Sequence, residues 1–310
     1  MSKAKSYCEK FNALLSSKSL AQYLEPERKL DVTSEATLRR IEQVIRTDDY
    51  FIPVNDLSSG HDIPEGIHVT PDDVNHMKVP NAQEVTPRRY RLYYDTPSLD
   101  AFRHGIEIRI EFPKATEHGH ARKFKQVVKL GTEATEEDPT FHRLEIAERL
   151  LQPIPSFDPK VLDGNKRLSA FLKDTVDCDA LRPLQLLSTV RTRLWCRTQD
   201  DPDTIIEFGF DRGRGMTVTN HRYPLLQVEP EVIRGDEAIL EPVVQRLVDK
   251  FGDKVMVNLH SKPTPGFDDL AAILHKNPKG KAFLAERSPD EFRFIKHREC
   301  PALFPAARVA

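Results

Sequence analysis

The stretch Glu25-Pro26-Glu27-Arg28-Lys29 lies in a strand-like segment, and Glu229-Pro230-Glu231 repeats its first three residue types late in the chain. Because successive side chains of a strand point to opposite faces, Glu25, Glu27 and Lys29 share one face. Two carboxylates on one face repel each other unless a positive charge lies between them. A divalent cation is one such partner, because hard cations bind carboxylate oxygens. The simpler interpretation is that both motifs form charged strand faces exposed to solvent. The other segments of the sequence are needed to choose between this interpretation and a metal site.

The composition describes a soluble protein with a balanced charge. The chain has 310 residues, enough for one large domain or two small ones. Its formal net charge is −2 although 30% of its residues are charged, so we expect no nucleic-acid partner. The four cysteines are scattered and have no zinc-binding spacing. Without a signal peptide or an apolar run of the ~20 residues that span a bilayer, the expected location is cytoplasmic, with no membrane partner.

The hydrophobic pattern predicts a chain rich in strands, with helices between them. We expect a helix in residues 1–20, a strand over Tyr23–Val32, a helix capped by Thr33 or Ser34, and a long loop over residues 48–89. Further strands are predicted at Tyr90–Tyr94, Ile106–Phe112, Lys123–Leu130, Phe141–Leu150, Leu186–Arg197, Thr204–Phe210, Met216–Thr219 and Tyr223–Val232. Helices are predicted at Asn165–Thr175, Asp236–Phe251 and Phe267–His275. Residues 1–275 would form the domain and residues 276–310 a C-terminal appendage.

Several predicted strands carry charges at a spacing of two, where an ordinary strand has one apolar face. The sets are Lys123, Lys125 and Lys129; Arg191, Arg193 and Arg197; Arg143 and Glu145; and Glu207 and Asp211. A sheet of about eight strands that closes on itself can enclose one small ligand. If these faces point inward, their mixed charges favour a polyanion bound with a metal, such as triphosphate or a nucleoside triphosphate with Mg²⁺ or Mn²⁺. Solvated surface charge is the other interpretation.

These motifs, taken in order, resemble the CYTH superfamily of triphosphate tunnel metalloenzymes. Glu25-Pro26-Glu27-Arg28-Lys29 resembles its Glu-x-Glu-x-Lys strand, and the run from Tyr93-Tyr94-Asp95-Thr96-Pro97 to Gly105 and Arg109 resembles its second motif. The later matches are Lys129-Leu130-Gly131, Arg143-Leu144-Glu145, Arg191-Thr192-Arg193, Ile206–Asp211, Glu229-Pro230-Glu231 and Ser261-Lys262. The match spans roughly residues 23–275.

The resemblance implies an α+β fold, in which an eight-stranded antiparallel β-barrel, the triphosphate tunnel, has flanking helices. It implies metal-dependent hydrolysis of a triphosphate. The substrate-binding residues would be Lys29, Arg109, Lys125, Lys129, Arg143, Arg191, Arg193 and Lys262. The ligands of Mg²⁺ or Mn²⁺ would be Glu25, Glu27, Asp211, Glu229 and Glu231, and Lys29, Glu27 and Glu145 would act in catalysis.

Some features depart from the family pattern or leave alternatives open. Glu111 stands where the family usually has a second arginine after Arg109, and Gln227 precedes the late acidic pair. Gly213-Arg214-Gly215 is predicted to be a hairpin turn. Inorganic tripolyphosphate is the favoured substrate, because no base-binding segment is visible. Adenylate cyclase and thiamine or nucleoside triphosphatase are alternatives within the family, and a non-catalytic polyphosphate or nucleotide sensor is an alternative of another class. The oligomeric state is left open.

Overall fold

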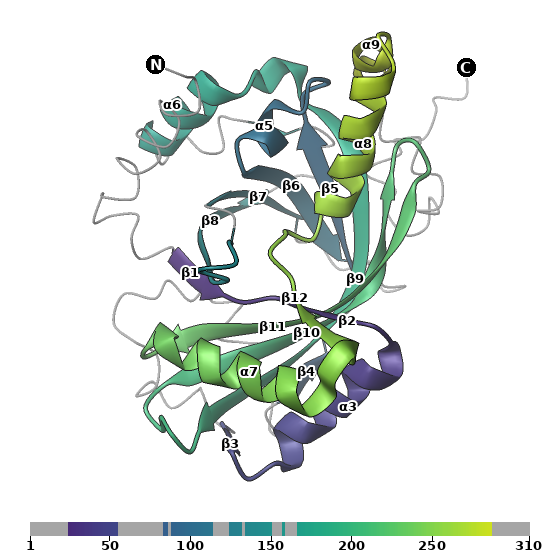
Figure 1. The fold of residues 1–310 in the computed structure, drawn as a ribbon. Coiled ribbons are helices and arrows are strands. Elements are labelled where there is room, and N and C mark those ends of the chain that lie inside the picture. Colours follow the sequence, from purple (N-terminus) through teal and green to yellow (C-terminus); the bar gives the residue numbers. More distant parts are fainter. Residues whose placement is uncertain are drawn as a thin grey trace, which may run out of the picture.

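The computed structural model describes residues 24–54, 83–85, 88–113, 124–131, 134–150, 157–158 and 166–286 (Figure 1). Six sequence predictions fall wholly or partly outside these ranges. They concern the helix in residues 1–20, most of the loop over 48–89, most of the appendage over 276–310, and the first residue of each of three elements, the strands that begin at Tyr23 and Lys123 and the helix that begins at Asn165.

Eight strands pair side by side into a closed ring, and every pairing is antiparallel. The ring closes where Glu27 of the first strand pairs with Glu231 of the last. In spatial order its strands are β1 (Leu24–Glu27), β8 (Phe141–Leu150), β7 (Phe124–Gly131), β6 (Ile106–Pro113), β5 (Arg89–Asp95), β9 (Arg182–Thr198), β10 (Ile205–Thr217) and β11 (Arg222–Arg234). The predicted fold class, an antiparallel ring of eight strands with flanking helices, is therefore confirmed.

Four short strands extend the sheet outside the ring. β2 (Leu30–Val32) pairs with β11 and with β12 (Val255–Val257), while β3 (Phe51–Pro53) and β4 (Gln83–Val85) pair with β9. The chain leaves β1 after Glu27 and enters β2 at Leu30, so the predicted strand over Tyr23–Val32 is two strands. This break lets one segment close the ring and also pair with the outer strand β12.

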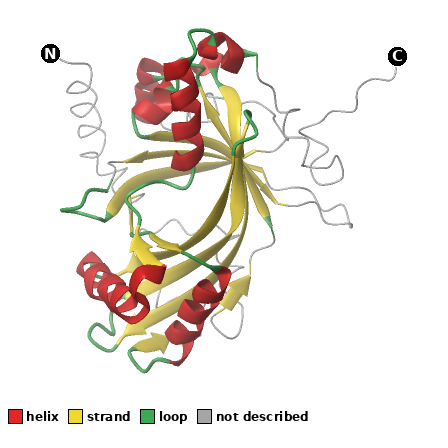
Figure 2. Cartoon of the chain, turned by 45° about the vertical axis from the view of Figure 1, so that its right-hand side comes forward, coloured by secondary structure: helices red, strands yellow, loops and turns green. Residues whose placement is uncertain are grey.

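Helices cover the outer faces of the strands in two groups, above and below the ring in Figures 1 and 2. The lower group is α3 (Glu35–Thr47) and α7 (Leu240–Phe251), whose apolar side chains form one buried cluster with Phe208 and Phe210 of β10. The upper group contributes to a second cluster and comprises α5 (Asp100–Arg103), α6 (Lys166–Thr175), α8 (Thr264–Lys276) and α9 (Gly280–Ala285). Short 3₁₀ helices lie at Cys178–Ala180, Glu237–Ile239 and Gly252–Lys254.

The helix α3 shows why the sequence pattern predicts these elements well. Ser34 caps it, because the Ser34 hydroxyl oxygen accepts a hydrogen bond from the Thr37 backbone N–H at 3.1 Å. Leu38, Ile41 and Ile45 then recur at helical spacing and are buried against the sheet. The predicted cap and helix are confirmed.

The predicted turn at Gly213-Arg214-Gly215 is wrong, because β10 runs without interruption from Ile205 to Thr217. The chain turns later, where Asn220 has a φ of 65°. The glycines instead make room for neighbouring strands. A Cβ at Gly213 would lie 2.2 Å from the Ser188 carbonyl oxygen, and one at Gly215 would lie 2.0 Å from the Tyr223 ring. Both glycines serve close packing rather than a turn.

The described part of the C-terminal region continues past residue 275. The helix α9 buries Leu284 completely in the upper apolar cluster. The boundary at 275 stays a prediction. No helix in the described residues is long and apolar enough to cross a membrane.

Candidate functional site

The charged side chains of the strands point into the ring, because the alternate side chains are packed beneath the helices. On β6, Ile106, Ile108 and Ile110 lie in the upper apolar cluster. Glu107, Arg109 and Glu111 therefore face the opposite way, into the ring. The same alternation holds for Phe208 and Phe210 of β10, which lie in the lower cluster and leave Glu207 and Asp211 on the inner face.

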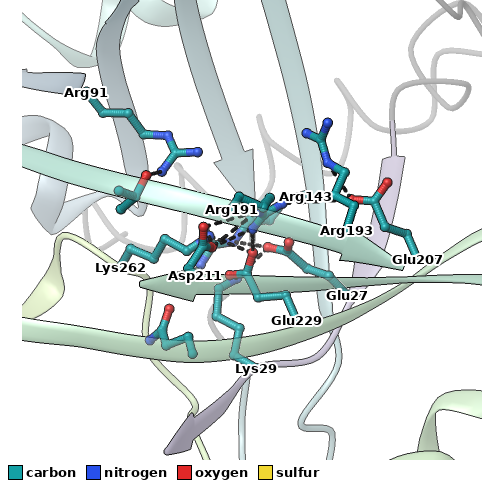
Figure 3. A network of polar contacts seen from close by, with 12 residues as sticks. Glu27, Lys29, Arg91, Arg143, Arg191, Arg193, Glu207, Asp211, Glu229 and Lys262 are labelled. Atoms are coloured by element: carbon teal, nitrogen blue, oxygen red, sulfur yellow. Dashed lines mark hydrogen bonds and ion pairs between the residues drawn. The ribbon is translucent and has the colours of Figure 1, made fainter. Parts of the chain in front are cut away.

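One group of inner charges lies where β1, β10 and β11 meet. Figure 3 shows Glu27, Asp211 and Glu229 pointing toward one another, with lysine and arginine side chains among them. The Lys29 ammonium forms an ion pair with Glu27 and lies 3.7 Å from Glu229 Oε1. It also lies 4.0 Å from the centroid of the Phe141 ring, which shields it from water. Lys29 of the first motif thus bridges Glu27 of the same motif and Glu229 of the late acidic motif.

Arg191 and Lys262 hold the other carboxylates of this group. Arg191 donates to Asp211 through Nε at 3.1 Å and Nη2 at 2.7 Å, and Nη2 also contacts Glu229. Lys262 Nζ lies 2.8 Å from Asp211 Oδ2 and 2.6 Å from Glu229 Oε2. Gly209 makes this geometry possible, because a Cβ there would lie 2.9 Å from Arg191 Cζ.

A second group of charges centres on Arg109. Its guanidinium donates from Nε to Glu111 at 2.8 Å and from Nη1 to Glu107 at 3.2 Å. The third contact runs from Nη2 to Glu145 at 3.4 Å. Arg109 therefore joins three carboxylates of β6 and β8, and Lys129 forms a further ion pair with Glu145.

A pocket of about 460 Å³, which includes space open to solvent, lies at the end of the ring beneath α5 and the start of α8. Glu107, Lys129 and Arg143 line its charged side, while Phe102, Pro263 and Phe267 line its apolar side. Arg143 Nη1 donates to Glu107 Oε1 at 2.7 Å. Lys129 and Arg143 are thus the predicted phosphate ligands that line this pocket.

The inner carboxylates stay ionised although they are buried. Burial alone would raise the pKa of Glu27, but the charges of Lys29 and Lys129 outweigh it and hold the pKa at about 2. Burial likewise opposes ionisation of Asp211 and Glu229, yet Arg191 and Lys262 keep both pKa values below the usual range. The pKa of Lys29 is lowered by burial and by Arg143. The interior is therefore a set of ionised, mutually paired groups.

Most of the predicted site residues face this interior, but they are not equally placed. The first group contains Glu27, Lys29, Asp211, Glu229, Arg191 and Lys262, and the second group has Arg109, Lys129, Arg143 and Glu145 in it or beside it.

The other predicted site residues lie outside these two groups. Arg193 lies apart, with its Nε 2.9 Å from Glu207 Oε1. Lys125 pairs by strand register with Glu111, far from the pocket, and Glu231 is half-buried opposite Glu27. The backbone of Glu25 in β1 pairs with that of Arg143 in β8, and the Glu25 side chain is not among the described parts of the structure.

The sequence prediction includes Glu207 in the charged interior but misses Glu107 and Arg91. Arg91 donates to Glu111 at 3.0 Å and to Thr189 at 2.9 Å. The sequence does carry a signal for these residues, because residues two apart on a strand share one face. Glu107 precedes Arg109 by two residues, and Arg91 precedes Tyr93 by two.

The inner carboxylates match a divalent cation in chemistry, although in the described residues no three Asp, Glu, His or Cys side chains gather as a ligand set. Glu229 Oε1 is buried and receives no hydrogen bond from a described residue. Glu27 and Glu229 both approach the Lys29 ammonium, so a positive charge already lies between them. Mg²⁺ is commonly held by one or two carboxylates together with substrate phosphates and water. Glu27 and Glu229 fit that pattern.

No protein-family model and no curated protein matches this sequence. Among solved structures, a putative adenylyl cyclase from Hippeastrum, described as having a dominant triphosphatase activity, has a TM-score of 0.47 at 13% identity and covers 79% of this chain and 96% of its own. A putative adenylate cyclase from Bacillus halodurans has a TM-score of 0.42 at 14% identity, covering 78% and 96%. The mimivirus capping-enzyme triphosphatase has a TM-score of 0.35 at 11% identity, covering 78% and 96%.

The ring of eight antiparallel strands is the fold that the resemblance of the sequence motifs implies.

Proposed function

We propose that the protein hydrolyses a triphosphate inside the ring with the help of Mg²⁺ or Mn²⁺, and that its preferred substrate is inorganic tripolyphosphate. One observation supports this above all: buried lysines, arginines and carboxylates converge on the inside of one closed ring. Phosphoryl transfer depends on positioning and on neutralising charge, which such an interior supplies without a covalent nucleophile.

The inner residues would have different roles according to their position. Lys129 and Arg143 line the pocket and would bind the phosphate groups that enter there. Glu27 and Glu229 would hold the divalent cation in place of the Lys29 ammonium. A cation bound there neutralises charge on phosphate oxygens. Glu145 uses Oε2 for both of its described ion pairs, so its Oε1 would orient the attacking water.

The test is product release from tripolyphosphate, ATP and thiamine triphosphate with Mg²⁺, Mn²⁺ or EDTA. We expect phosphate release from tripolyphosphate only with a divalent cation, and loss of turnover in Glu27→Gln and Glu229→Gln. Glu241→Gln is the matched control, because Glu241 lies on α7 and pairs with Arg28. Full activity in EDTA, or wild-type rates in both inner variants, would refute the metal assignment. Cyclic nucleotide from ATP would indicate a cyclase, and tight binding without turnover would indicate a sensor.

A further inference from the structure

Glu111 of β6 lies between two arginines and is held by both. Its Oε1 accepts a hydrogen bond from Arg91 Nε at 3.0 Å and another from Arg109 Nε at 2.8 Å. The residue is only 9% exposed. Burial alone would raise its pKa, but Arg109, Arg91 and Arg89 hold that pKa well below the usual range. Glu111 is thus a permanent negative charge in the ring.

The two arginines have the remaining sides of their guanidinium groups engaged as well. Arg91 Nη1 donates to Thr189 Oγ1 at 2.9 Å. Arg109 donates from Nη1 to Glu107 and from Nη2 to Glu145. An arginine that binds phosphate uses the same forked N–H groups. At this point of the ring, the protein's own carboxylate holds the position that a phosphate would take between two guanidinium groups.

The position of Glu111 along β6 determines when a phosphate chain that enters at the pocket would reach it. Glu107, Arg109 and Glu111 follow one another on the inner face of β6, and Glu107 lines the pocket. At about 3.3 Å per residue, Glu111 lies roughly 13 Å further along the strand than Glu107. Its strand neighbours are Arg91 and Lys125. A phosphate chain that enters at the pocket therefore meets Glu111 after it has passed Lys129, Arg143 and Arg109.

We propose that Glu111 is a specificity-determining residue that ends the phosphate-binding path and so restricts the substrate to short polyphosphates. It keeps the Arg91 end of the ring from accepting a further phosphate group. This inference rests on the proposed function and adds a length limit to it. Each additional phosphate beyond the limit should bring no affinity in the wild-type protein, because its charge would face Glu111.

The test measures the affinity for pyrophosphate, tripolyphosphate and tetrapolyphosphate by calorimetry, with Mg²⁺ present, in wild type and in Glu111→Gln. The wild type should bind tripolyphosphate and tetrapolyphosphate with similar affinity. Glu111→Gln should bind tetrapolyphosphate roughly tenfold more tightly than tripolyphosphate, because the freed guanidinium groups gain a charged partner. Glu42→Gln is the matched control. Glu42 is similarly buried and pairs with two arginines, but it lies on α3, outside the ring. It should keep the wild-type ratio.

The outcomes separate the length limit from the proposed function. An unchanged ratio in Glu111→Gln, or the same rise in both variants, would overturn the role of Glu111. If the wild type binds no polyphosphate, the proposed function fails. The role of Glu111 then stands only if Glu111→Gln alone acquires polyphosphate binding. If Glu111→Gln does not fold, the charge-balanced double variant Arg91→Gln, Glu111→Gln replaces it. That variant should still favour tetrapolyphosphate, by a smaller factor because only Arg109 remains, and a wild-type ratio there would overturn the inference.

Discussion

At the scale of single residues, Arg109 acts as a junction between carboxylates. The resemblance implies a phosphate ligand at this position, whereas the described structure has its three nitrogens on Glu107, Glu111 and Glu145. Arg109→Met would remove one cationic partner from each of three buried carboxylates, which keep Arg143, Arg91 and Lys129, so we expect the free energy of unfolding to fall by about 1.5–3 kcal/mol. Urea denaturation measures this. Arg39→Met is the control, because its pair with Glu35 is exposed and should contribute far less to stability. Equal losses in the two variants would contradict the junction.

The pKa of Glu27 leads to a pH prediction at the same scale. Because its pKa is about 2 in the folded protein against 4.5 ordinarily, the unfolded chain binds more protons between these values. The stabilisation is present above about pH 5 and is lost as the pH falls toward 2, on the order of 3 kcal/mol in all. Glu27→Gln should therefore flatten the acid side of the stability profile. Urea denaturation at several pH values tests this, and an unchanged slope would disprove it.

At the scale of elements, β10 combines charged residues with glycines on its inner face. Gly209 lets the Arg191 guanidinium lie across the strand, since a Cβ there would be 2.9 Å from Arg191 Cζ. Gly209→Ala should displace that group from Asp211 and lower stability by about 1–3 kcal/mol. In an Arg191→Ala background the same change should be neutral or slightly stabilising, because alanine is less flexible than glycine. A double-mutant cycle measured by denaturation decides this, and additive effects would rule out the explanation.

At the scale of the whole molecule, the ring encloses nearly balanced charge. The described interior holds the cations Lys29, Arg89, Arg91, Arg109, Lys125, Lys129, Arg143, Arg191, Arg193 and Lys262, against the carboxylates Glu27, Glu107, Glu111, Glu145, Glu207, Asp211, Glu229 and Glu231. A triphosphate therefore meets little excess positive charge unless a divalent cation accompanies it.

This balance predicts that metal and triphosphate bind together. Thermal unfolding should shift upward with Mg²⁺ and tripolyphosphate combined by more than the sum of the shifts that each produces alone, because each one binds better in the presence of the other. At about 100 times the dissociation constant, the combined stabilisation should approach 2.7 kcal/mol. Melting curves with each component alone and with both measure the coupling. A full shift with tripolyphosphate in EDTA would contradict it.

The sequence by itself determined most strands of the ring, the capped helix α3 and the faces on which many of the charges lie. These features depend on local periodicity, because a spacing of two places Glu27 with Lys29 and Arg191 with Arg193 wherever the strands end up. The order of the motifs also indicated the fold class, since the resemblance implied the eight-stranded ring.

Only the tertiary structure decided which charges meet. Glu111 receives Arg91, Lys262 reaches Asp211, and Lys29 reaches Glu229. These partners are far apart in the chain or depend on strand register and on the closure between β1 and β11, which no local pattern encodes. For the same reason, Gly213 and Gly215 suggested a turn in the sequence but serve close packing in the fold.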